Sequence, residues 1–433
     1  MLRTLALSLV SGCAVIPSTV DYSELPIDKA IARTLDHLDE GYSFTEHKAL
    51  DWQAERERLN PEAEEAASNE DIDRVIRQLV TTMPDSHVQL WNDDTKRDLC
   101  PEAEASYGIA LSDLDDGRVI VTAASGELEP GDEVLYWNGL SVDDAAGAVA
   151  FHCFPVGVAT DDRIRQVQLQ LLTRDLADAT SQIRVSRDGE ELEVALTATP
   201  DTDDVLVAMG LERPDTLITR EMLRKNVGYI RVGWEETYIT EQRFQKALVA
   251  LDREGAVGLV IDLRGNDGGM ERTAANLAGY FTDRRWFYET VTFYNNRTGE
   301  QSEISEVWVE PQEVRWRKPV AVLVDANTVS SGEGLSMMFD RFAHVQVVGF
   351  EGTSASFGST GSKVRLARGW TLHFPGGRSL DAEGRIQLDS DHTMRGGVYP
   401  NVRVPWTADN RIAHANGEDV ALDLAIDTVL EAL

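Results

Sequence analysis

Apolar residues follow a helical pattern near the start of the chain. Between residues 23 and 82 they recur every three or four positions, which places them on one face of an α-helix. The last stretch of this kind begins at Ser68 or Asn69, either of which can cap a helix, and no proline interrupts it before Pro84. The pattern predicts a helical N-terminal region, to which we assign residues 23–100.

The hydrophobic pattern changes after residue 104. Short runs typical of β-strands alternate with turn dipeptides such as Asp116-Gly117 and Pro130-Gly131. Within this part of the chain, residues 161–177 have the spacing of a helix instead. We therefore predict a β-rich module over residues 101–200.

From residue 225 onward, apolar runs of strand length alternate with stretches of helical length. We expect strands at 227–232, 258–263 and 319–324, and helices at 240–254, 273–281 and 334–342. Such alternation is typical of a parallel sheet covered by helices. Residues 201–433 are predicted to form an α/β core, and the chain as a whole an α/β multidomain protein. Residues 1–22 would precede the folded part as a signal and tether.

Composition and charge narrow the classes of protein. Apolar residues make up 42% and charged residues 27% of the 433 positions, which excludes whole-chain disorder, collagen and coiled coil. The net charge of −33 would repel a phosphate backbone, so we expect no nucleic-acid partner. After the N-terminus, no segment approaches the ~20 apolar residues of a membrane span.

The first residues, MLRTLALSLVSGC, combine one basic residue with a short apolar run. This run suits a secretion signal, and Ser11-Gly12-Cys13 after it resembles the lipobox of bacterial lipoproteins. The resemblance implies a lipid on Cys13, which would be the only attachment to a membrane. It also implies a periplasm-facing position in the bacterial cell envelope, and Ala14 favours the outer membrane over the inner one. The alternatives are a plain signal peptide, or a cytosolic N-terminus with a chance cysteine. Export would allow Cys100 and Cys153 to pair.

Part of the β-rich module resembles a PDZ domain. The run Pro130-Gly-Asp-Glu-Val-Leu135, followed by Asn138-Gly139, carries the resemblance. In such domains a glycine-containing loop presents backbone N–H groups to the C-terminal carboxylate of a peptide, which then adds as a strand. Here Tyr107, Gly108 and Ile109 would form that peptide-binding loop. The alternative is a small β-domain in which strand pairing is merely structural.

Three segments of the α/β core carry candidate chemistry. They are Asp262-Leu-Arg-Gly-Asn-Asp-Gly-Gly269, Thr328-Val-Ser-Ser-Gly-Glu333 after an apolar strand, and Gly396-Gly-Val-Tyr-Pro400. A serine between a strand and a helix has an exposed hydroxyl beside free N–H groups of the helix N-terminus. Glycines let backbone approach a substrate closely. In this order the segments resemble the C-terminal processing and tricorn-type serine peptidases, which implies a ClpP/crotonase-like core.

The resemblance implies roles for particular residues. Ser330 would be the nucleophile, and the amides of Ser331 and Gly268 would form the oxyanion hole. Ser331 is the alternative nucleophile, and an N-cap role is the structural alternative for Ser330. Glu333 matches the family pattern, but it could merely favour the helix N-terminus.

The base is the open question in this site. Many family members use a lysine in a Phe-Gly-Lys-Gly loop, but this loop reads Phe357-Gly-Ser-Thr-Gly361, and Lys363 lies at a different spacing. Tricorn-type members use a histidine in an Asp-Ser-His setting, which here reads Asp85-Ser-His87. We therefore predict His87 as the general base with Ser86 nearby, and keep Lys363 as the alternative.

The tricorn-type arrangement adds a glutamate near the glycine-rich motif at residue 396. Gln387 stands near that place, and Asp389 or Asp391 could substitute for the glutamate. The histidines lack metal-like spacing, so we predict neither a metal nor a cofactor.

The leading hypothesis is an exported serine endopeptidase that cleaves proteins or peptides by acyl transfer. Its PDZ-like module would select C-terminal segments. The first alternative is a catalytically degenerate binder of peptides or other ligands with the same fold, which the missing lysine and glutamate favour. The second is a structural envelope lipoprotein. The sequence leaves the substrate and the oligomeric state open.

Overall fold

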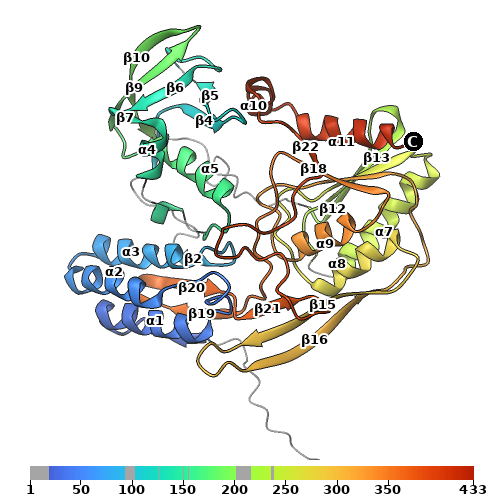
Figure 1. The fold of residues 1–433 in the computed structure, drawn as a ribbon, viewed down its shortest axis with the longest axis horizontal. Coiled ribbons are helices and arrows are strands. Elements are labelled where there is room, and N and C mark those ends of the chain that lie inside the picture. The colour runs from blue at the N-terminus through green and yellow to red at the C-terminus, as the bar shows by residue number, and fades with distance from the viewer. Residues whose placement is uncertain are drawn as a thin grey trace, which may run out of the picture.

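A computed structural model describes most of the chain. The described residues are 19–92, 103–124, 126–149, 151–154, 156–200, 216–235 and 238–433. The prediction of a lipid on Cys13 falls outside them. Cys153 is disulfide-bonded, and its partner also lies outside the described residues. The structure confirms the predicted fold class, an α/β multidomain protein with several sheets (Figure 1).

Three helices form the N-terminal layer. They are α1 (Ile27–Gly41), α2 (Trp52–Glu65) and α3 (Asn69–Gln78), and the 3₁₀ turn Leu79–Thr82 follows. Ser68 caps α3 in a capping box: its hydroxyl accepts the backbone N–H of Asp71, and the Asp71 carboxylate accepts the N–H of Ser68. The helical region was therefore predicted correctly.

A small sheet closes the N-terminal layer with strands from distant parts of the chain. Its order is β1 (Thr19–Asp21), β19 (Ser362–Arg365), β20 (Trp370–Phe374) and β2 (Gln89–Asn92). Val364, Leu372 and Phe374 are buried against the helices of this layer. Figure 1 shows the late strands β19 and β20 beside α1–α3. A segment expected within the core thus completes the N-terminal layer, and residues expected as a tether form β1.

The β-rich module spans the described residues from 103 to 200. Its main sheet has the order β10 (Glu190–Thr197), β9 (Thr180–Arg187), β6 (Glu133–Trp137), β5 (Val119–Ala124) and β4 (Ile109–Asp113), and β7 (Leu140–Ser141) pairs with β6. A second sheet joins β11 (Thr199–Pro200), β3 (Ala105–Ser106) and β8 (Arg174–Asp175). The helices are α4 (Val142–Gly147), the 3₁₀ turn Phe151–Cys153 and α5 (Asp161–Leu172). The helix α5 ends before residue 177 because Arg174 and Asp175 pair with β3.

The core is built on a six-stranded sheet, which contains the three strands expected from the sequence. Its order is β12 (Ile218–Met222), β13 (Val227–Val232), β14 (Gly258–Asp262), β17 (Val320–Leu323), β18 (Val345–Gly349) and β22 (Val402–Arg403), parallel except for β12. The helices α7 (Tyr238–Arg253), α8 (Glu271–Ala278) and α9 (Ser331–Asp340) contribute to one hydrophobic cluster, and α11 (Val420–Glu431) contributes to another. Every residue of β14 is buried, as expected for a strand covered on both faces.

A long ribbon joins the core to the N-terminal layer. It consists of β16 (Gln301–Val309), β15 (Trp286–Tyr294) and β21 (Gly377–Leu380). Arg378 of β21 donates to the backbone oxygen of Ser43 at 2.6 Å. The remaining elements are α10 (Ala408–Ala415) and the 3₁₀ turns Arg224–Asn226, Gly279–Phe281 and Ala367–Gly369. Of the helices described, none has both the length and the apolar character needed to cross a membrane.

The contact between β14 and α11 yields a testable prediction. A Cβ at Gly258 would overlap Cγ1 of Val429 on α11 and lie 2.9 Å from the backbone oxygen of Pro319. Gly258→Ala should therefore lower the free energy of unfolding by about 1–3 kcal/mol through overpacking. Urea denaturation would measure this change. The matched control is Gly147→Ala, because a Cβ at Gly147 meets open space. An equal effect of both substitutions would contradict the assigned contact.

Candidate active site

Ser330 lies at the junction between the loop after β17 and the helix α9. Its φ of 59° lies in the left-handed region, which is uncommon for a residue with a side chain. Its backbone N–H donates to the oxygen of Ser356 at 3.1 Å, and its own backbone oxygen accepts the N–H of Gly334 at 3.1 Å. These bonds hold a half-buried serine in an unfavourable conformation, which is a common feature of functional sites.

Ser331 begins α9 and directs its hydroxyl into the protein. This side chain is fully buried and donates to Oε2 of Glu235 at 3.1 Å. Its backbone N–H has no acceptor in the part of the chain that the structure describes, as is common in the first turn of a helix. The buried hydroxyl makes Ser331 a poor candidate for attack on a substrate, whereas its open N–H suits an oxyanion hole.

The glycine turn after β14 packs directly against Ser330. A Cβ at Gly268 would lie 2.6 Å from Cβ of Ser330 and 2.9 Å from the nitrogen of Ser331, so only glycine fits. The N–H of Gly268, however, already donates to Oδ1 of Asn266 at 2.8 Å. The N–H of the next residue, Gly269, has no acceptor among the described residues. The backbone N–H groups that remain open to a substrate oxygen are therefore that of Gly269 in this turn and that of Ser331 at the start of α9.

Glu235 lies behind this turn and was not singled out from the sequence. Burial raises the pKa of its carboxyl to about 7, against hydrogen bonds from Asn266 and Ser331 that lower it. Asn266 donates to Oε1 of Glu235 at 2.8 Å and accepts the Gly268 N–H, so one side chain connects the carboxyl to the turn. No local pattern marks Glu235, because it lies 95 positions before Ser330 (330 − 235 = 95).

Glu333 anchors the loop that follows β18. Its buried carboxylate accepts Thr353 Oγ1 at 2.6 Å, the Ala355 N–H at 2.7 Å and the Ser356 N–H at 2.8 Å. Burial raises its pKa to about 7, and these hydrogen bonds oppose the rise. Glu333 therefore does more than favour the helix N-terminus, since it fixes the loop that receives the Ser330 N–H.

Ser356 connects the Ser330 segment to the predicted histidine segment. Its backbone oxygen accepts the N–H of Ser330, and its hydroxyl accepts the N–H of Ser86 at 2.8 Å. Ser86 and Ser330 are therefore both hydrogen-bonded to Ser356, although they are 244 positions apart in the chain (330 − 86 = 244).

His87 is buried between the 3₁₀ turn after α3 and the strand β2. Its backbone N–H donates to Oδ1 of Asp85 at 2.9 Å. Its ring atom Nδ1 has no hydrogen-bond partner among the described residues. Burial lowers the pKa of the imidazole, the negative charge of Asp85 raises it, and the positive charge of Lys48 lowers it. The ring is therefore neutral, and able to accept a proton, near pH 7.

A charged cluster surrounds His87, and sequence reasoning found only part of it. Tyr42 donates to Oδ2 of Asp85 at 2.8 Å, and buried Lys48 donates to the backbone oxygen of Ser390 at 2.8 Å. Asp389 accepts the N–H of Phe357 with Oδ1, while its buried Oδ2 has no partner among the described residues. Burial, followed by the charge of Asp85, raises the pKa of Asp389 well above its usual range. Lys48 gave no sequence signal because a lone lysine usually marks a solvated surface.

The other candidate residues have different contacts. Gln387 donates to the backbone oxygen of Tyr288 at 3.1 Å and to Ser379 Oγ at 3.3 Å. Asp391 accepts the N–H and hydroxyl of Thr393 near the surface. Lys363 lies in β19, paired with Thr19 and His373. Among the described residues, no group of histidine, cysteine and acidic side chains could hold a metal ion.

The predicted peptide-binding loop is internally hydrogen-bonded. The N–H of Tyr107 donates to the oxygen of Thr173 at 2.9 Å, and that of Gly108 donates to Ser106 Oγ at 3.0 Å. Ile109 begins β4, paired with Ala124. A peptide carboxylate would therefore compete with internal acceptors at two of these amides.

Comparison with known proteins identifies the core. Residues 226–404 match the model of Peptidase family S41. The carboxy-terminal processing proteases CtpA and CtpB of Bacillus subtilis strain 168 are 22% and 21% identical to the chain over 342 and 345 residues. These matches cover 77% and 78% of this chain but 63% and 61% of the relatives, so the chain spans about six tenths of their length.

A solved structure supports the fold over nearly the whole chain. Mature CPAF superposes with a TM-score of 0.66 at 13% identity, covering 94% of this chain and 98% of that one. The predicted resemblance to the C-terminal processing peptidases is confirmed: residues 226–404 match the model of peptidase family S41, and the fold is that of mature CPAF.

The raised pKa of Glu235 predicts how stability depends on pH. Its pKa in the folded protein, about 7, exceeds the ordinary value of 4.5 for a glutamate, so the folded state binds the proton more tightly. The bound proton contributes up to about 3 kcal/mol to the free energy of unfolding. This contribution is complete below about pH 4.5 and is lost as the pH rises through about 7. Glu235→Gln should flatten this part of the stability curve, measured by urea denaturation at pH 5 and pH 8. Glu418→Gln, at an exposed position, should not. Equal slopes in parent and Glu235→Gln would contradict the assigned pKa.

Proposed function

We propose that the protein is a serine endopeptidase in which Ser330 attacks the carbonyl carbon of a peptide bond. The observation that carries this proposal is the placement of Ser330. It has a left-handed backbone at the start of α9, packs against the Gly268 turn, and is tied through Ser356 to the His87 segment. The match of residues 226–404 to family S41 and the similarity to CtpA and CtpB support the same reaction class.

The proposed reaction is an acyl transfer in two steps. His87 takes the hydroxyl proton of Ser330 as its oxygen bonds to the carbonyl carbon, and then gives the proton to the leaving amine. Water, deprotonated by His87, hydrolyses the resulting ester and restores Ser330. The N–H groups of Ser331 and Gly269 would stabilise the negative oxygen of the tetrahedral intermediate. Gly268 would not bind this oxygen itself. We propose that it permits the tight turn that directs the N–H of Gly269 toward it.

The acidic cluster near His87 would support the base. Asp389 is our candidate for the carboxylate that tricorn-type peptidases supply as glutamate, because it is buried and the charges of Asp85 and Lys48 act on it. The bonds of Gln387 and Asp391 direct those side chains elsewhere. Ser86 directly precedes His87 in the chain, and we propose that its hydroxyl lies near the proton that His87 accepts.

The β-rich module is proposed to bind a segment of the substrate. β4 is the last strand of its sheet, so it could receive an added peptide strand along its free edge. A cavity of about 290 Å³ lies beside β4 and α5, and Leu111 and Leu169 are among its lining residues. Strand addition there would leave the internal bonds of Tyr107 and Gly108 intact.

The place of action is also a proposal. The N-terminal sequence supports export and a lipid on Cys13, which would hold the enzyme at the periplasmic face of the bacterial outer membrane. Substrates would then be proteins or peptides of that compartment.

The nucleophile is tested by covalent labelling. Ser330→Ala should abolish labelling by a fluorophosphonate probe and lower peptide hydrolysis by roughly 10³-fold or more, with unfolding unchanged. Mass spectrometry of the labelled parent should place the adduct on Ser330. Ser305→Ala, on the exposed side of β16, is the matched control. An adduct on Ser331, or no labelling and no turnover in the parent, would refute the assignment, and the latter result would favour the degenerate binder.

The base is tested by mutation and pH. His87→Ala should lower kcat by ~10²-fold or more, because the serine loses its proton acceptor. In the parent, kcat/KM should rise with pH through an ionisation below the usual value of 6.5, since burial lowers the pKa of His87. That ionisation should vanish in His87→Ala. Lys363→Ala serves as the control, and loss of activity there with full activity in His87→Ala would transfer the role to the lysine.

A further inference from the structure

The cavity beside β4 has a charged end that the proposed strand addition does not use. Its volume of about 290 Å³ lies where the β-rich module meets the core. The module contributes β4 and α5 to its walls, and the core contributes the segment after β17, the loop after β18 and α10. Figure 1 shows α10 beside β4 and β5. Ligand sites often lie at such junctions, so these charged side chains are candidates for substrate recognition.

Arg411 is the first cation at this end of the cavity. It belongs to α10, and its guanidinium lies 5.0 Å from the ring centroid of Trp406 and 5.3 Å from that of Phe350. Its Nε donates to Oγ of Ser112 on β4 at 2.5 Å, and its two terminal nitrogens have no acceptor among the described residues. The aromatic rings therefore hold a guanidinium whose terminal N–H groups remain available to a ligand.

Arg163 is the second cation, and it comes from the module. This residue of α5 donates from Nη1 to Oε1 of Gln166 at 3.1 Å and from Nη2 to Oδ1 of Asn327 at 3.2 Å, and both acceptors are neutral amides. Within the described ranges, no carboxylate is close enough to form an ion pair with Arg163 or Arg411. Burial lowers the pKa of each guanidinium, and the more distant charge of Glu351 only partly opposes this effect.

Most other charged groups of the cavity already have partners. Asp113 pairs with Arg165 at 3.1 Å, Asp325 accepts a backbone N–H at 2.9 Å, and Arg264 pairs with two other aspartates at 2.7 Å. Glu351 is different, because its buried Oε2 has no partner in the part of the chain that the structure describes. Burial raises the pKa of Glu351, which favours its neutral form. The cavity therefore has an excess of positive charge inside a protein whose net charge is −33.

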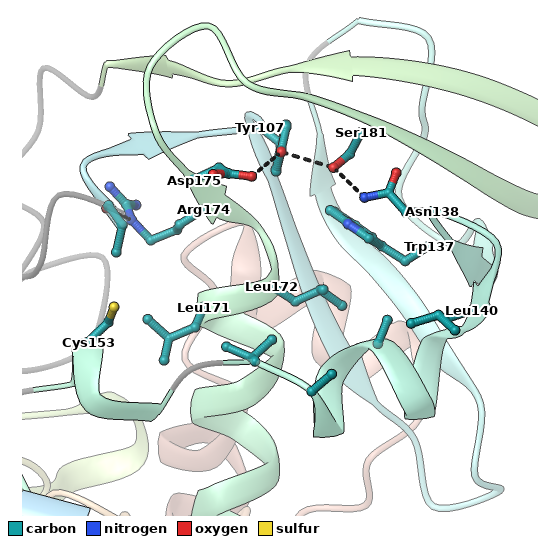
Figure 2. Close-up of a pocket in the computed structure, with 14 residues that line it drawn as sticks. Tyr107, Trp137, Asn138, Leu140, Cys153, Leu171, Leu172, Arg174, Asp175 and Ser181 are labelled. Carbon is teal, nitrogen blue, oxygen red and sulfur yellow. Dashed lines mark hydrogen bonds between the residues drawn. The ribbon is translucent and has the colours of Figure 1, made fainter. Parts of the chain in front are cut away.

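The position of the two arginines along β4 indicates which part of a peptide they would meet. The other end of the strand is held by bonds within the module: Figure 2 shows the Tyr107 hydroxyl bonded to Asp175 at 2.8 Å and to Ser181 at 2.9 Å. Ser112 lies three residues after Ile109, where β4 begins (112 − 109 = 3). Each strand residue adds about 3.3 Å, so the arginines lie roughly 10 Å from the loop predicted to hold a peptide terminus. A carboxylate there would belong to a side chain.

We propose that this cavity selects substrates by an acidic side chain, whose carboxylate binds to the guanidinium groups of Arg163 and Arg411. The inference rests on the proposed addition of a substrate strand to β4. Guanidinium N–H groups match the oxygens of a carboxylate, and such charge-assisted hydrogen bonds are stronger than neutral ones. The acidic residue would lie about three residues before the end of a peptide that reaches the Tyr107 loop. Leu111 and Leu169 of the same cavity would contact apolar parts of the substrate.

Titration of the full chain with synthetic peptides tests the charge requirement. Ser330→Ala is carried throughout, so that no peptide is cleaved during calorimetry. A short apolar peptide with one glutamate about three residues before its C-terminus should bind at least ~10-fold more tightly than the same peptide with glutamine. Amidation of the C-terminus should leave this ratio unchanged. Equal binding of the two peptides, binding of neither, or a ratio that disappears on amidation would overturn the proposal.

The assignment to the cavity is tested by substitution. Arg411→Gln should reduce the preference for glutamate to less than ~3-fold, because the charged donor is lost. Arg403→Gln is the matched control: it removes an ion pair with Asp115 at 2.7 Å, also between core and module, but Arg403 does not line the cavity. It should keep the preference. A preference that survives Arg411→Gln, or that is lost equally in both variants, would overturn the assignment. The peptide series decides the proposal even if Arg411→Gln does not fold.

Turnover separates this inference from the proposed reaction. With Ser330 intact, the glutamate peptide should have a lower KM than the glutamine peptide and a similar kcat, because the cavity contributes to binding and not to the chemical step. Hydrolysis of both peptides without any preference would overturn the inference and leave the reaction in place. Tighter binding of the glutamate peptide without hydrolysis would overturn the reaction and support the inference.

Discussion

The buried carboxylate of Glu333 is the constraint on which the candidate site depends. It accepts three hydrogen bonds from residues 353–356 and thereby fixes the loop after β18 beside the first turn of α9. That loop presents Ser356, which holds the N–H of Ser330 on one side and the N–H of Ser86 on the other. Because an unpaired buried carboxylate is costly, the loop has one favourable arrangement, and the distance between the two candidate catalytic segments follows from it.

A protein this acidic places several of its carboxyl groups inside. Glu235, Glu333 and Asp389 are buried near Ser330 or His87, and burial raises the pKa of each. A raised pKa favours the protonated, neutral form of a buried carboxyl, and hydrogen bonds stabilise the charged form where it is present. Lys48 is the buried cation among them, bonded to the Ser390 hydroxyl and backbone. The site is therefore an electrostatic cluster contributed by both the N-terminal layer and the core.

Much of the fold, and the position of Ser330 in it, could be predicted from local sequence. The strand β13 matches its predicted bounds, and Ser330 lies at the predicted strand-to-helix junction. Tyr42, Lys48 and Glu235 could not be assigned roles in the same way, because a single polar residue in an amphipathic stretch has no periodic signature. The bounds of α5 also differ, since the pairing of Arg174 and Asp175 with β3 ends the helix earlier than its spacing suggests.

By itself, the sequence determined the alternation of strands and helices, the glycine pair after β14 and the serine at the start of α9, because spacing and backbone freedom are local properties. Only the tertiary structure decided which amides remain open. Asn266 occupies the Gly268 N–H, and Glu235 draws the Ser331 hydroxyl inward. It also decided that residues 362–374 complete the N-terminal layer rather than the core sheet. These outcomes depend on contacts between segments far apart in the chain, which hydrophobic periodicity does not encode.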